Sequence, residues 1–257
     1  MIANYHTHTP RCNHAEGTEE EYVIAGIEAG LKILGFADHT PYPFEGGAYS
    51  HIRMRPDELE GYAQSVFSMR QKYGDKIRLP LGVEIEYFPQ FWDEQLSMLR
   101  DAGVEYLLLG QHWSEYGGTL PYNGKPTEDE DLLAAYCNSV RLAMQTGVLT
   151  YIAHPDLIYF TGSDDIYRRH MQGLCRDAKN CGIPLEINMV GLRTGRHYPN
   201  GKFWEIAAEE GCKVVLGCDA HRPMDLLNSG AIAQAQEIQR SLGLELLETL
   251  SLQSFKA

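Results

Sequence analysis

The sequence predicts an α/β fold in which a parallel sheet closes into a single (β/α)7 barrel. Short apolar runs alternate with helical patterns along the 257 residues, and this order requires parallel strands joined by right-handed crossovers. The runs lack polar alternation, as expected for strands covered by helices. No stretch rich in Gly, Pro or Ser divides the chain, so we expect one domain over residues 1–257. An open, doubly wound sheet is the alternative, because periodicity alone does not separate the two arrangements.

The expected strands are short apolar runs bounded by turn residues. They lie at residues 2–5, 33–37, 81–85, 105–109, 149–153, 183–187 and 213–216. Between them, Thr18 with Glu21 and Thr127 with Glu130 have the spacing of capping boxes, and Pro56 opens a helix. The first expected helix begins at residue 18, and the others span 56–73, 89–102, 127–146, 164–180, 202–210 and 223–242. We expect the leucines of the last 15 residues to cover either the barrel or a partner.

Composition limits the class of protein. Lys and Arg number 22 against 35 Asp and Glu, and this net charge of −13 argues against a nucleic-acid partner held by phosphate contacts. The longest apolar runs are far shorter than the ~20 residues of a membrane span. The chain opens without a basic and apolar leader, and its six Cys form no C-x-x-C pair. We therefore expect a cytoplasmic protein with reduced thiols and no membrane partner; the sequence does not indicate its oligomeric state.

Histidines and carboxylates gather at the C-terminal ends of the expected strands. In a parallel barrel these ends meet on one face, where active sites form. Imidazole and carboxylate ligands suit Zn, Mn or Fe, and the set is too large for one ion but suits two or three. Alternate residues of a strand point the same way, so the two His of the H-x-H motif can grip one ion. The set is His6, His8, His14, His39, Glu84, His112, His154, Asp219 and His221.

These motifs, in this order, resemble the polymerase-and-histidinol-phosphatase (PHP) family over residues 5–222. The resemblance implies a distorted (β/α)7 TIM-like barrel with its active site at the C-terminal ends of the strands and three divalent ions, Zn, Mn or Fe. The segments 185–188, 191–193 and 198–199 resemble the histidinol-phosphate phosphatase branch. Cys218, where Ser is common, and residues 111–115 depart from the family pattern. The matching motifs are His6-Thr7-His8, His14, Ala37-Asp38-His39, Gly82-Val83-Glu84-Ile85-Glu86, Gly110-Gln111-His112, Ala153-His154-Pro155-Asp156 and Cys218-Asp219-Ala220-His221.

The resemblance also implies how the ligands divide among the three ions. The first ion would take His6, His8, Glu84 and Asp219. The second would take Glu84, His112 and His154, with Glu84 as a bridge. The third would take His14, His39 and His221. Cys12 lies two residues before His14, but the set is complete without it, so we interpret Cys12 as incidental.

The implied activity is a metal-dependent phosphomonoesterase that hydrolyses L-histidinol phosphate, in histidine biosynthesis, by means of a hydroxide bridging two ions. Catalysis would depend on Glu84, Asp219, His221 and Arg193. The substrate would contact Arg193, Arg196 and His197, in the loop after the sixth strand, and Trp113 and Glu115, after the fourth. The proton donor to the leaving group stays open among Asp38, Asp156, Glu115 and metal-bound water. Asp38 and Asp156 could equally orient His ligands.

Three other functions remain as alternatives. The first is a PHP phosphatase or phosphodiesterase for another small ester, such as a sugar phosphate, a nucleotide or phosphotyrosine. The second is a catalytically silent metal-binding protein, which requires closed coordination shells; two of the implied ions have only three protein ligands. The third is a related barrel hydrolase for C–N bonds, against which His14, Glu84 and the terminal Asp-Ala-His argue.

Overall fold

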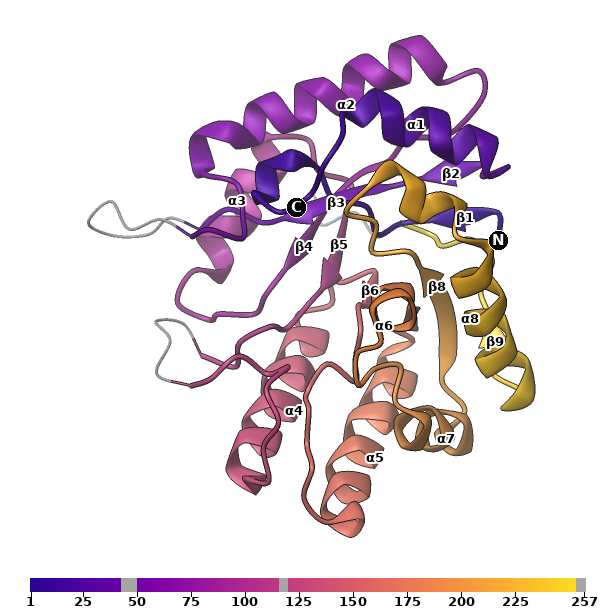
Figure 1. The fold of residues 1–257 in the computed structure, drawn as a ribbon. Coiled ribbons are helices and arrows are strands. Elements are labelled where there is room, and N and C mark those ends of the chain that lie inside the picture. Colours follow the sequence, from indigo (N-terminus) through magenta and orange to yellow (C-terminus); the bar gives the residue numbers. More distant parts are fainter. Residues whose placement is uncertain (43–49, 116–119, 253–257) are drawn as a thin grey trace.

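The computed structural model describes residues 1–42, 50–115 and 120–252 (Figure 1). Its larger sheet is parallel, and each strand lies beside the next strand in the sequence. This order has no reversal point, unlike that of a doubly wound sheet. The strands of this sheet are β3 (Phe36–His39), β4 (Leu81–Ile85), β5 (Tyr106–Leu109), β6 (Tyr151–Ile152), β7 (Leu185–Asn188), β8 (Lys213–Gly217) and β9 (Glu245–Leu246), and β1 (Ala3–Asn4) pairs separately with β2 (Ile33–Leu34).

The segment that follows β1 joins the two ends of the larger sheet. On one side, the Ala37 N–H donates to the Thr7 carbonyl at 2.8 Å. On the other, the His8 N–H donates to the Ala220 carbonyl at 2.9 Å, and the Ala220 N–H donates to the His6 carbonyl at 3.1 Å. Backbone hydrogen bonds therefore continue from the end of β8 through residues 6–8 to β3. The barrel is distorted because β9, rather than β1, pairs with the start of β8.

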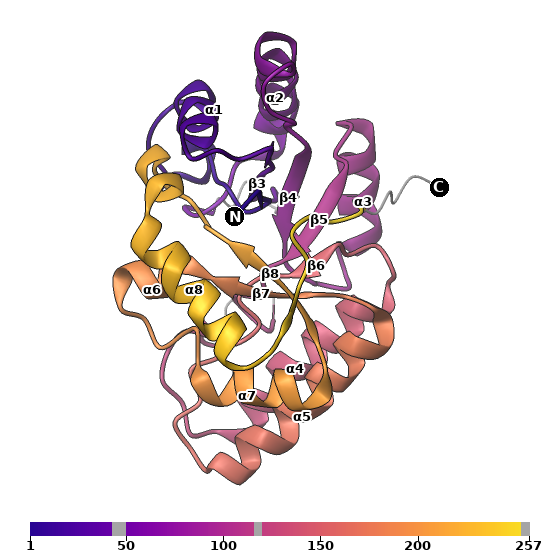
Figure 2. The same cartoon turned by 90° about the vertical axis from the view of Figure 1, so that its right-hand side faces the viewer.

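Helices surround the strands (Figure 2). The capping box predicted at Thr18 is confirmed, since Thr18 and Glu21 exchange side chain–backbone hydrogen bonds. The capping box predicted at Thr127 is wrong, because the side chain of Asp129 caps the helix instead. The helices are α1 (Glu19–Glu28), α2 (Leu59–Tyr73), α3 (Trp92–Asp101), α4 (Glu130–Gln145), α5 (Asp164–Cys181), α6 (Met189–Thr194), α7 (Gly201–Glu210) and α8 (Ser229–Ser241), with 3-10 turns η1 (Pro10–Cys12), η3 (Pro56–Glu58) and η4 (Pro223–Leu227).

Two predicted elements are divided in the structure. The strand expected over 33–37 breaks at Gly35 into β2 and β3. A Cβ at Gly35 would lie 2.3 Å from the hydroxyl oxygen of Tyr106. The Tyr106 side chain lies inside the barrel, where its hydroxyl donates to the Tyr5 carbonyl oxygen at 2.7 Å. The helix expected over 223–242 divides at Asn228, whose side chain accepts a hydrogen bond from the Ala231 N–H and so begins α8.

The chain has two apolar cores. The larger lies between the helices and the outer face of the sheet. The smaller fills the barrel around Tyr5, Tyr106, Tyr151 and Leu250. Because the Leu250 N–H also bonds the Tyr5 hydroxyl at 3.0 Å, the tail closes the N-terminal end of the barrel and leaves the other end for a site. Among the described helices, none is both long and apolar enough to cross a membrane.

Candidate active site

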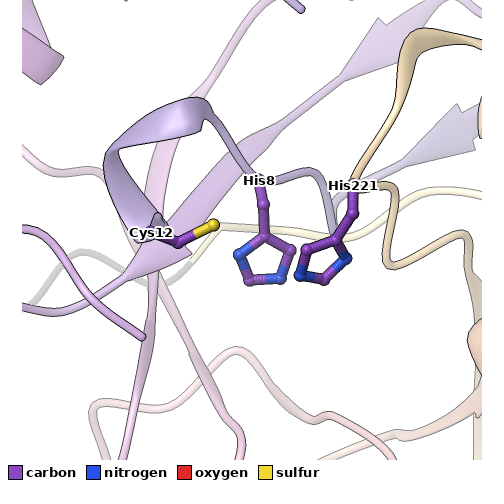
Figure 3. A group of neighbouring side chains, drawn as sticks. All are labelled: His8, Cys12 and His221. Atoms are coloured by element: carbon purple, nitrogen blue, oxygen red, sulfur yellow. The ribbon is translucent and has the colours of Figure 1, made fainter. Parts of the chain in front are cut away.

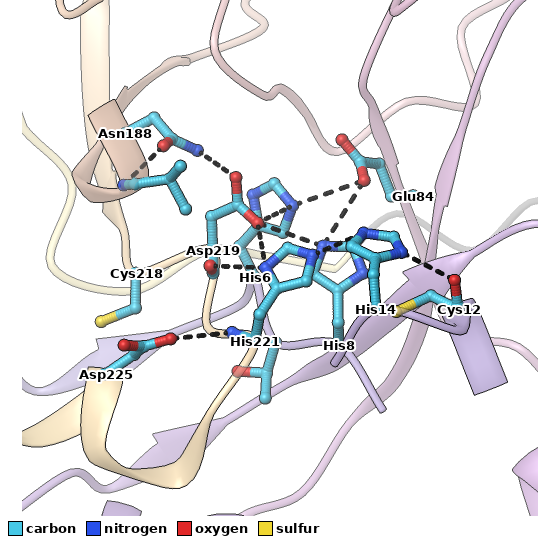
Figure 4. Close-up of polar contacts among 12 residues, drawn as sticks. His6, His8, Cys12, His14, Glu84, Asn188, Cys218, Asp219, His221 and Asp225 are labelled. Carbon is cyan, nitrogen blue, oxygen red and sulfur yellow. Dashed lines mark hydrogen bonds and ion pairs between the residues drawn. The ribbon is translucent and has the colours of Figure 1, made fainter. Parts of the chain in front are cut away.

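The structure brings the nine predicted ligands together at the C-terminal ends of the strands. Figure 4 shows His6, His8, His14, Glu84, Asp219 and His221. The deepest group consists of His6, His8, Glu84 and Asp219, all buried. The Nε2 atom of His6 lies 3.6 Å from both Glu84 Oε2 and Asp219 Oδ1. The Nε2 atom of His8 lies 3.6 Å and 3.2 Å from the same two oxygens. These four side chains thus point four ligand atoms at one small volume.

A carboxylate beside the Nδ1 atom of each ring keeps a proton on that nitrogen. His6 Nδ1 lies 2.8 Å from Glu186 Oε1, and His8 Nδ1 lies 3.4 Å from Asp38 Oδ1. Because a carboxylate only accepts, both Nδ1 atoms donate, and the two Nε2 atoms face the centre of the group. Both Nε2 atoms and Asp219 Oδ1 are buried without a hydrogen-bond partner among the described residues. A divalent cation, which would replace any proton on the two Nε2 atoms, would bind both nitrogens and both carboxylate oxygens, so this group fits such an ion.

A second pair of imidazoles, those of His14 and His221, is oriented by backbone carbonyls in place of carboxylates. His14 Nδ1 lies 2.7 Å from the Cys12 carbonyl oxygen, and His221 Nδ1 lies 3.1 Å from that of Asp219. Both rings therefore turn lone pairs toward each other, with 3.0 Å between the two Nε2 atoms. Burial and the nearby charge of His8 lower the pKa of His221 to about 3, and burial lowers the pKa of His14. A shared proton is thus disfavoured, and a metal ion fits.

Glu84 lies between the remaining ligands. Its Oε1 atom is 2.9 Å from His154 Nε2 and 3.8 Å from His112 Nε2. Its Oε2 atom is 2.9 Å from His39 Nδ1. The two oxygens therefore face different histidines, which is the arrangement a bridging carboxylate needs. His39 also groups with the pair formed by His14 and His221.

The charges of this cluster suit metal ligation. Burial disfavours the charged form of each group, yet the surrounding histidines hold the pKa of Glu84 and that of Asp219 well below the usual range. Against the same burial, the carboxylates of Glu186, Asp219 and Glu84 raise the pKa of His6 to about 10. In the metal-free protein His6 is thus protonated at neutral pH. A metal ion would displace this proton, so metal binding should release protons.

Close packing and unusual backbone angles build the site. A Cβ at Gly110 would lie 1.8 Å from Glu84 Oε1, and one at Gly217 would lie 1.7 Å from Glu186 Oε1. Glycine at these two positions therefore leaves room for the two carboxylates. His154 and Asp219 have φ angles of 29° and 48°, a backbone conformation that residues other than Gly rarely adopt. Such angles persist where surrounding structure holds them, often at functional sites.

Cys12 lies near two predicted ligands, His8 and His221, but its sulfur does not lie between them. Cys12, His8 and His221 offer ligand atoms within 4.8 Å of one another. Figure 3 shows the sulfur of Cys12 on the opposite side of the His8 ring from His221. The interpretation of Cys12 as incidental to ligation agrees with this arrangement.

A pocket of about 490 Å³ opens above the ligands. Three arginines line it: Arg193, Arg196 and Arg222. The predicted substrate contact Arg193 is mostly engaged with the protein, because its guanidinium donates to the carbonyls of Cys218 at 2.6 Å and Asp219 at 3.1 Å. Sequence reasoning missed Arg222, although it directly follows His221.

The other predicted substrate contacts divide between the pocket and its surroundings. Trp113 and Arg196 line the pocket. His197 lies instead in an adjoining hollow, where its Nε2–H donates to the Leu157 carbonyl at 2.7 Å and its ring stacks on Tyr159. Glu115 is exposed and is not among the described residues that line the pocket. Two tyrosines that sequence reasoning missed, Tyr122 and Tyr198, also line the pocket.

Neither buried aspartate proposed as a proton donor lines the pocket. Asp38 faces His8 Nδ1 and accepts the backbone N–H of His39 at 2.8 Å, so it orients ligands. Asp156 Oδ2 accepts the backbone N–H of Asn200 at 2.6 Å and the indole N–H of Trp204 at 3.1 Å. Asp156 thus anchors the start of α7, and burial raises its pKa to about 6.

Glu186 and Asn188 are functional neighbours whose roles sequence reasoning missed. Glu186 contacts His6 through Oε1 and accepts the His154 N–H through Oε2 at 3.1 Å. The Asn188 amide donates to Glu186 Oε2 at 2.8 Å and to Asp219 Oδ2 at 3.0 Å. Their position at the end of the sixth predicted strand was the available signal.

The fold and the site define a metal-dependent barrel hydrolase. Residues 4–189 match the PHP domain model, and the chain belongs to the PHP domain family. A probable histidinol-phosphatase from Deinococcus radiodurans is 30% identical over 234 residues, covering 86% of this chain and 87% of that protein. A histidinol-phosphatase from Bacillus subtilis is 23% identical over 254 residues, covering 86% of this chain and 94% of that protein.

A crystal structure of histidinol phosphate phosphatase from Lactococcus lactis, complexed with zinc, L-histidinol and phosphate, has a TM-score of 0.76 to this chain. The two are 20% identical in sequence, and the match covers 97% of each chain. This likeness shows the fold, and it confirms the distorted barrel expected from the sequence.

Proposed function

We propose that this protein is a metal-dependent phosphomonoesterase that hydrolyses L-histidinol phosphate to L-histidinol and phosphate, a step of histidine biosynthesis. One observation carries the proposal: ring nitrogens of at least four histidines and the oxygens of two carboxylates converge beneath a pocket that three arginines line. A cation-binding floor beneath a basic wall suits a phosphate ester. The similarity to proteins named histidinol-phosphatase supports the identity of that ester.

The proposed ligand sets follow the geometry. His6, His8, Asp219 and Glu84 Oε2 would hold one ion, and His14, His39 and His221 another. His112, His154 and Glu84 Oε1 would hold a third. Divalent ions of the Zn, Mn or Fe type, when bound, polarise a phosphoryl oxygen and make water nucleophilic near neutral pH.

The remaining residues would bind and orient the substrate. Arg196 and Arg222 line the pocket and are exposed, so their guanidinium groups can meet phosphate oxygens. Arg193 would act on Asp219, because it holds the carbonyl groups of residues 218 and 219. Trp113 would meet the rest of the substrate, and Glu115 and His197 would contribute only if a bound substrate extends beyond the pocket.

Phosphate release by the metal-reconstituted protein tests the proposal. L-histidinol phosphate is compared with a sugar phosphate, a nucleotide and phosphotyrosine, each with Zn, Mn and Fe in turn. We expect kcat/KM of ~10⁴ M⁻¹ s⁻¹ or more on histidinol phosphate, the lower end of the usual enzyme range, and at least 100-fold less on the others. Equal activity across the panel would leave a phosphatase of another substrate, and no activity with any metal would reject the proposal.

The same proposal includes the partners and the cellular location of the enzyme. A biosynthetic step on a small phosphate ester requires neither a nucleic-acid nor a membrane partner. It also places the enzyme in the cytoplasm, which cell fractionation would check.

A further inference from the structure

We propose that Arg53 and Glu86 form a positioning pair, which sets His112 against the metal centre and joins it to the segment that walls the pocket. Neither residue is one of the nine predicted ligands. Both are nearly inaccessible, at 5% and 2% exposed. Glu86 Oε2 lies 2.6 Å from Arg53 Nη2, so the pair is a buried, charge-assisted hydrogen bond.

Glu86 holds the backbone of His112 and faces its ring. Its Oε1 atom accepts the backbone N–H groups of His112 and Trp113, each at 3.2 Å. The same oxygen lies 3.6 Å from His112 Nδ1. On its other side the His112 ring turns Nε2 toward Glu84 Oε1. Glu86 therefore lies behind His112, on the side of the ring away from Glu84, and holds it through the backbone, whereas Glu186 bonds the ring of His6 directly. Glu86 also holds the backbone of Trp113, which lines the pocket.

Arg53 connects this carboxylate to the segment before α2. Its Nη1–H donates to the Thr40 carbonyl at 3.4 Å, and its Nε–H donates to the Ser50 hydroxyl at 3.2 Å. The guanidinium lies over the Tyr42 ring, 4.6 Å from the centroid. The neighbouring Ile52 lines the metal pocket. One side chain thus joins Thr40, directly after β3, to residues 50–53 and to the carboxylate behind His112.

Burial indicates a role beyond stability. A buried ion pair gains little over an apolar pair of the same volume, because desolvation offsets its attraction. Removing one partner is costly, since the other charge is left unpaired. The contacts of Glu86 fall on the segment that holds a predicted ligand, and this points to the orientation of His112.

The opposite end of β5 provides a matched control. There Glu105 accepts the Leu81 N–H at 2.7 Å and also pairs with Arg70. This pair has the same chemistry as Arg53–Glu86: a carboxylate that bonds backbone N–H and an arginine. Its side chains are 32% and 38% exposed, and it lies away from the ligands, so Glu105→Gln reports the loss of a structural pair alone.

The test measures metal affinity in Glu86→Gln, Arg53→Met, the double variant and Glu105→Gln. Zinc is titrated against a chelator, and kcat and KM are measured beside thermal melting of the metal-free proteins. We expect the affinity for one of the bound zinc ions to fall by about 10- to 100-fold in Glu86→Gln and Arg53→Met, as in other proteins when a group that orients a metal ligand is removed. We expect kcat to fall with little change in KM, and Glu105→Gln to retain wild-type affinity.

The double variant decides whether the two residues act as a unit. We expect it to bind zinc no more weakly than the weaker single variant, whereas independent residues would multiply their effects. Unchanged zinc affinities, or an equal loss in Glu105→Gln, would overturn the proposal. If Glu86→Gln does not fold, Arg53→Lys, which retains the charge but loses the planar fork, is judged by the same criteria.

The inference rests on the proposed function only for kcat and KM. If the wild-type protein releases no phosphate from any ester, the proposed function fails, while the zinc titration still decides the role of the pair.

Discussion

The pair His6 and His8 and the pair His14 and His221 offer similar ligand atoms in different surroundings. His6 and His8 are fully buried, and carboxylates stand behind both rings. His14 is exposed and His221 is partly exposed, and backbone carbonyls stand behind both. A carboxylate orients the ring and also makes it a stronger metal ligand, whereas a carbonyl mainly orients it. The comparison therefore predicts one tightly held ion and one exchangeable ion.

Asp219→Asn should produce the largest effect, because the Asp219 carboxylate belongs to the deep site itself and its Oδ1 atom lies 3.6 Å from His6 Nε2 and 3.2 Å from His8 Nε2. The amide retains the shape but loses the charge that two histidines face. We expect kcat to fall by about 10³-fold, equivalent to ~4 kcal/mol, together with loss of the deep ion measured by elemental analysis. Wild-type metal content in this variant would contradict the placement of Asp219 at the deep site.

Asp156→Asn examines a buried carboxylate that faces a backbone N–H and an indole rather than a histidine. The pKa of Asp156 is raised from 3.8 to about 6, so the folded state binds more protons than the unfolded state between these pH values. The free energy of unfolding of the metal-free protein should therefore fall by ~3 kcal/mol from this group as pH rises from about 4 to 6.

The asparagine variant lacks this ionisation, so its stability should gain relative to wild type above pH 6. Urea unfolding at pH 4 and pH 7 measures the difference. A constant gap between the two proteins at both pH values would show that Asp156 does not titrate as stated.

Glu186→Gln separates the two pairs directly. It removes the charge behind His6 but leaves the carbonyls behind His14 and His221 in place. We expect the affinity of the deep ion to fall by about 10- to 100-fold, with no change for the exposed ion, measured by zinc titration. A loss shared equally between the two sites would contradict the separate roles of carboxylate and carbonyl.

Graded chelation gives the smallest expected difference. A mild chelator should remove the ion at His14 and His221 first, at a concentration about 10-fold below that needed for the deep ion, a difference of ~1.4 kcal/mol. His14→Ala serves as the control, because it should abolish the first step and retain the second. Simultaneous loss of all bound metal in the wild-type protein would break the comparison.

The sequence alone predicted that the nine candidate ligand residues would lie together, because strands of a parallel barrel end on one face. His6 and Asp219 are far apart in the chain, yet each follows an apolar strand, and the structure places them 3.6 Å apart. The sequence also predicted the barrel and, apart from their boundaries, most of its strands, but it missed β9, which lies in the predicted tail and pairs with β8. It did not show that Tyr106 would divide the second strand, since that requires the side chains inside the barrel.

Tertiary structure alone decided what stands behind each ligand. Glu186 reaches His6 from a strand 180 residues away, and Arg53 reaches Glu86 across a loop. Arg193, predicted to meet substrate, lines the pocket and also donates to the backbone carbonyl of Asp219. The physical reason is that spacing along the chain determines which residues reach the same end of the barrel, whereas ring orientation, protonation and hydrogen-bond partners depend on contacts between strands that only packing creates.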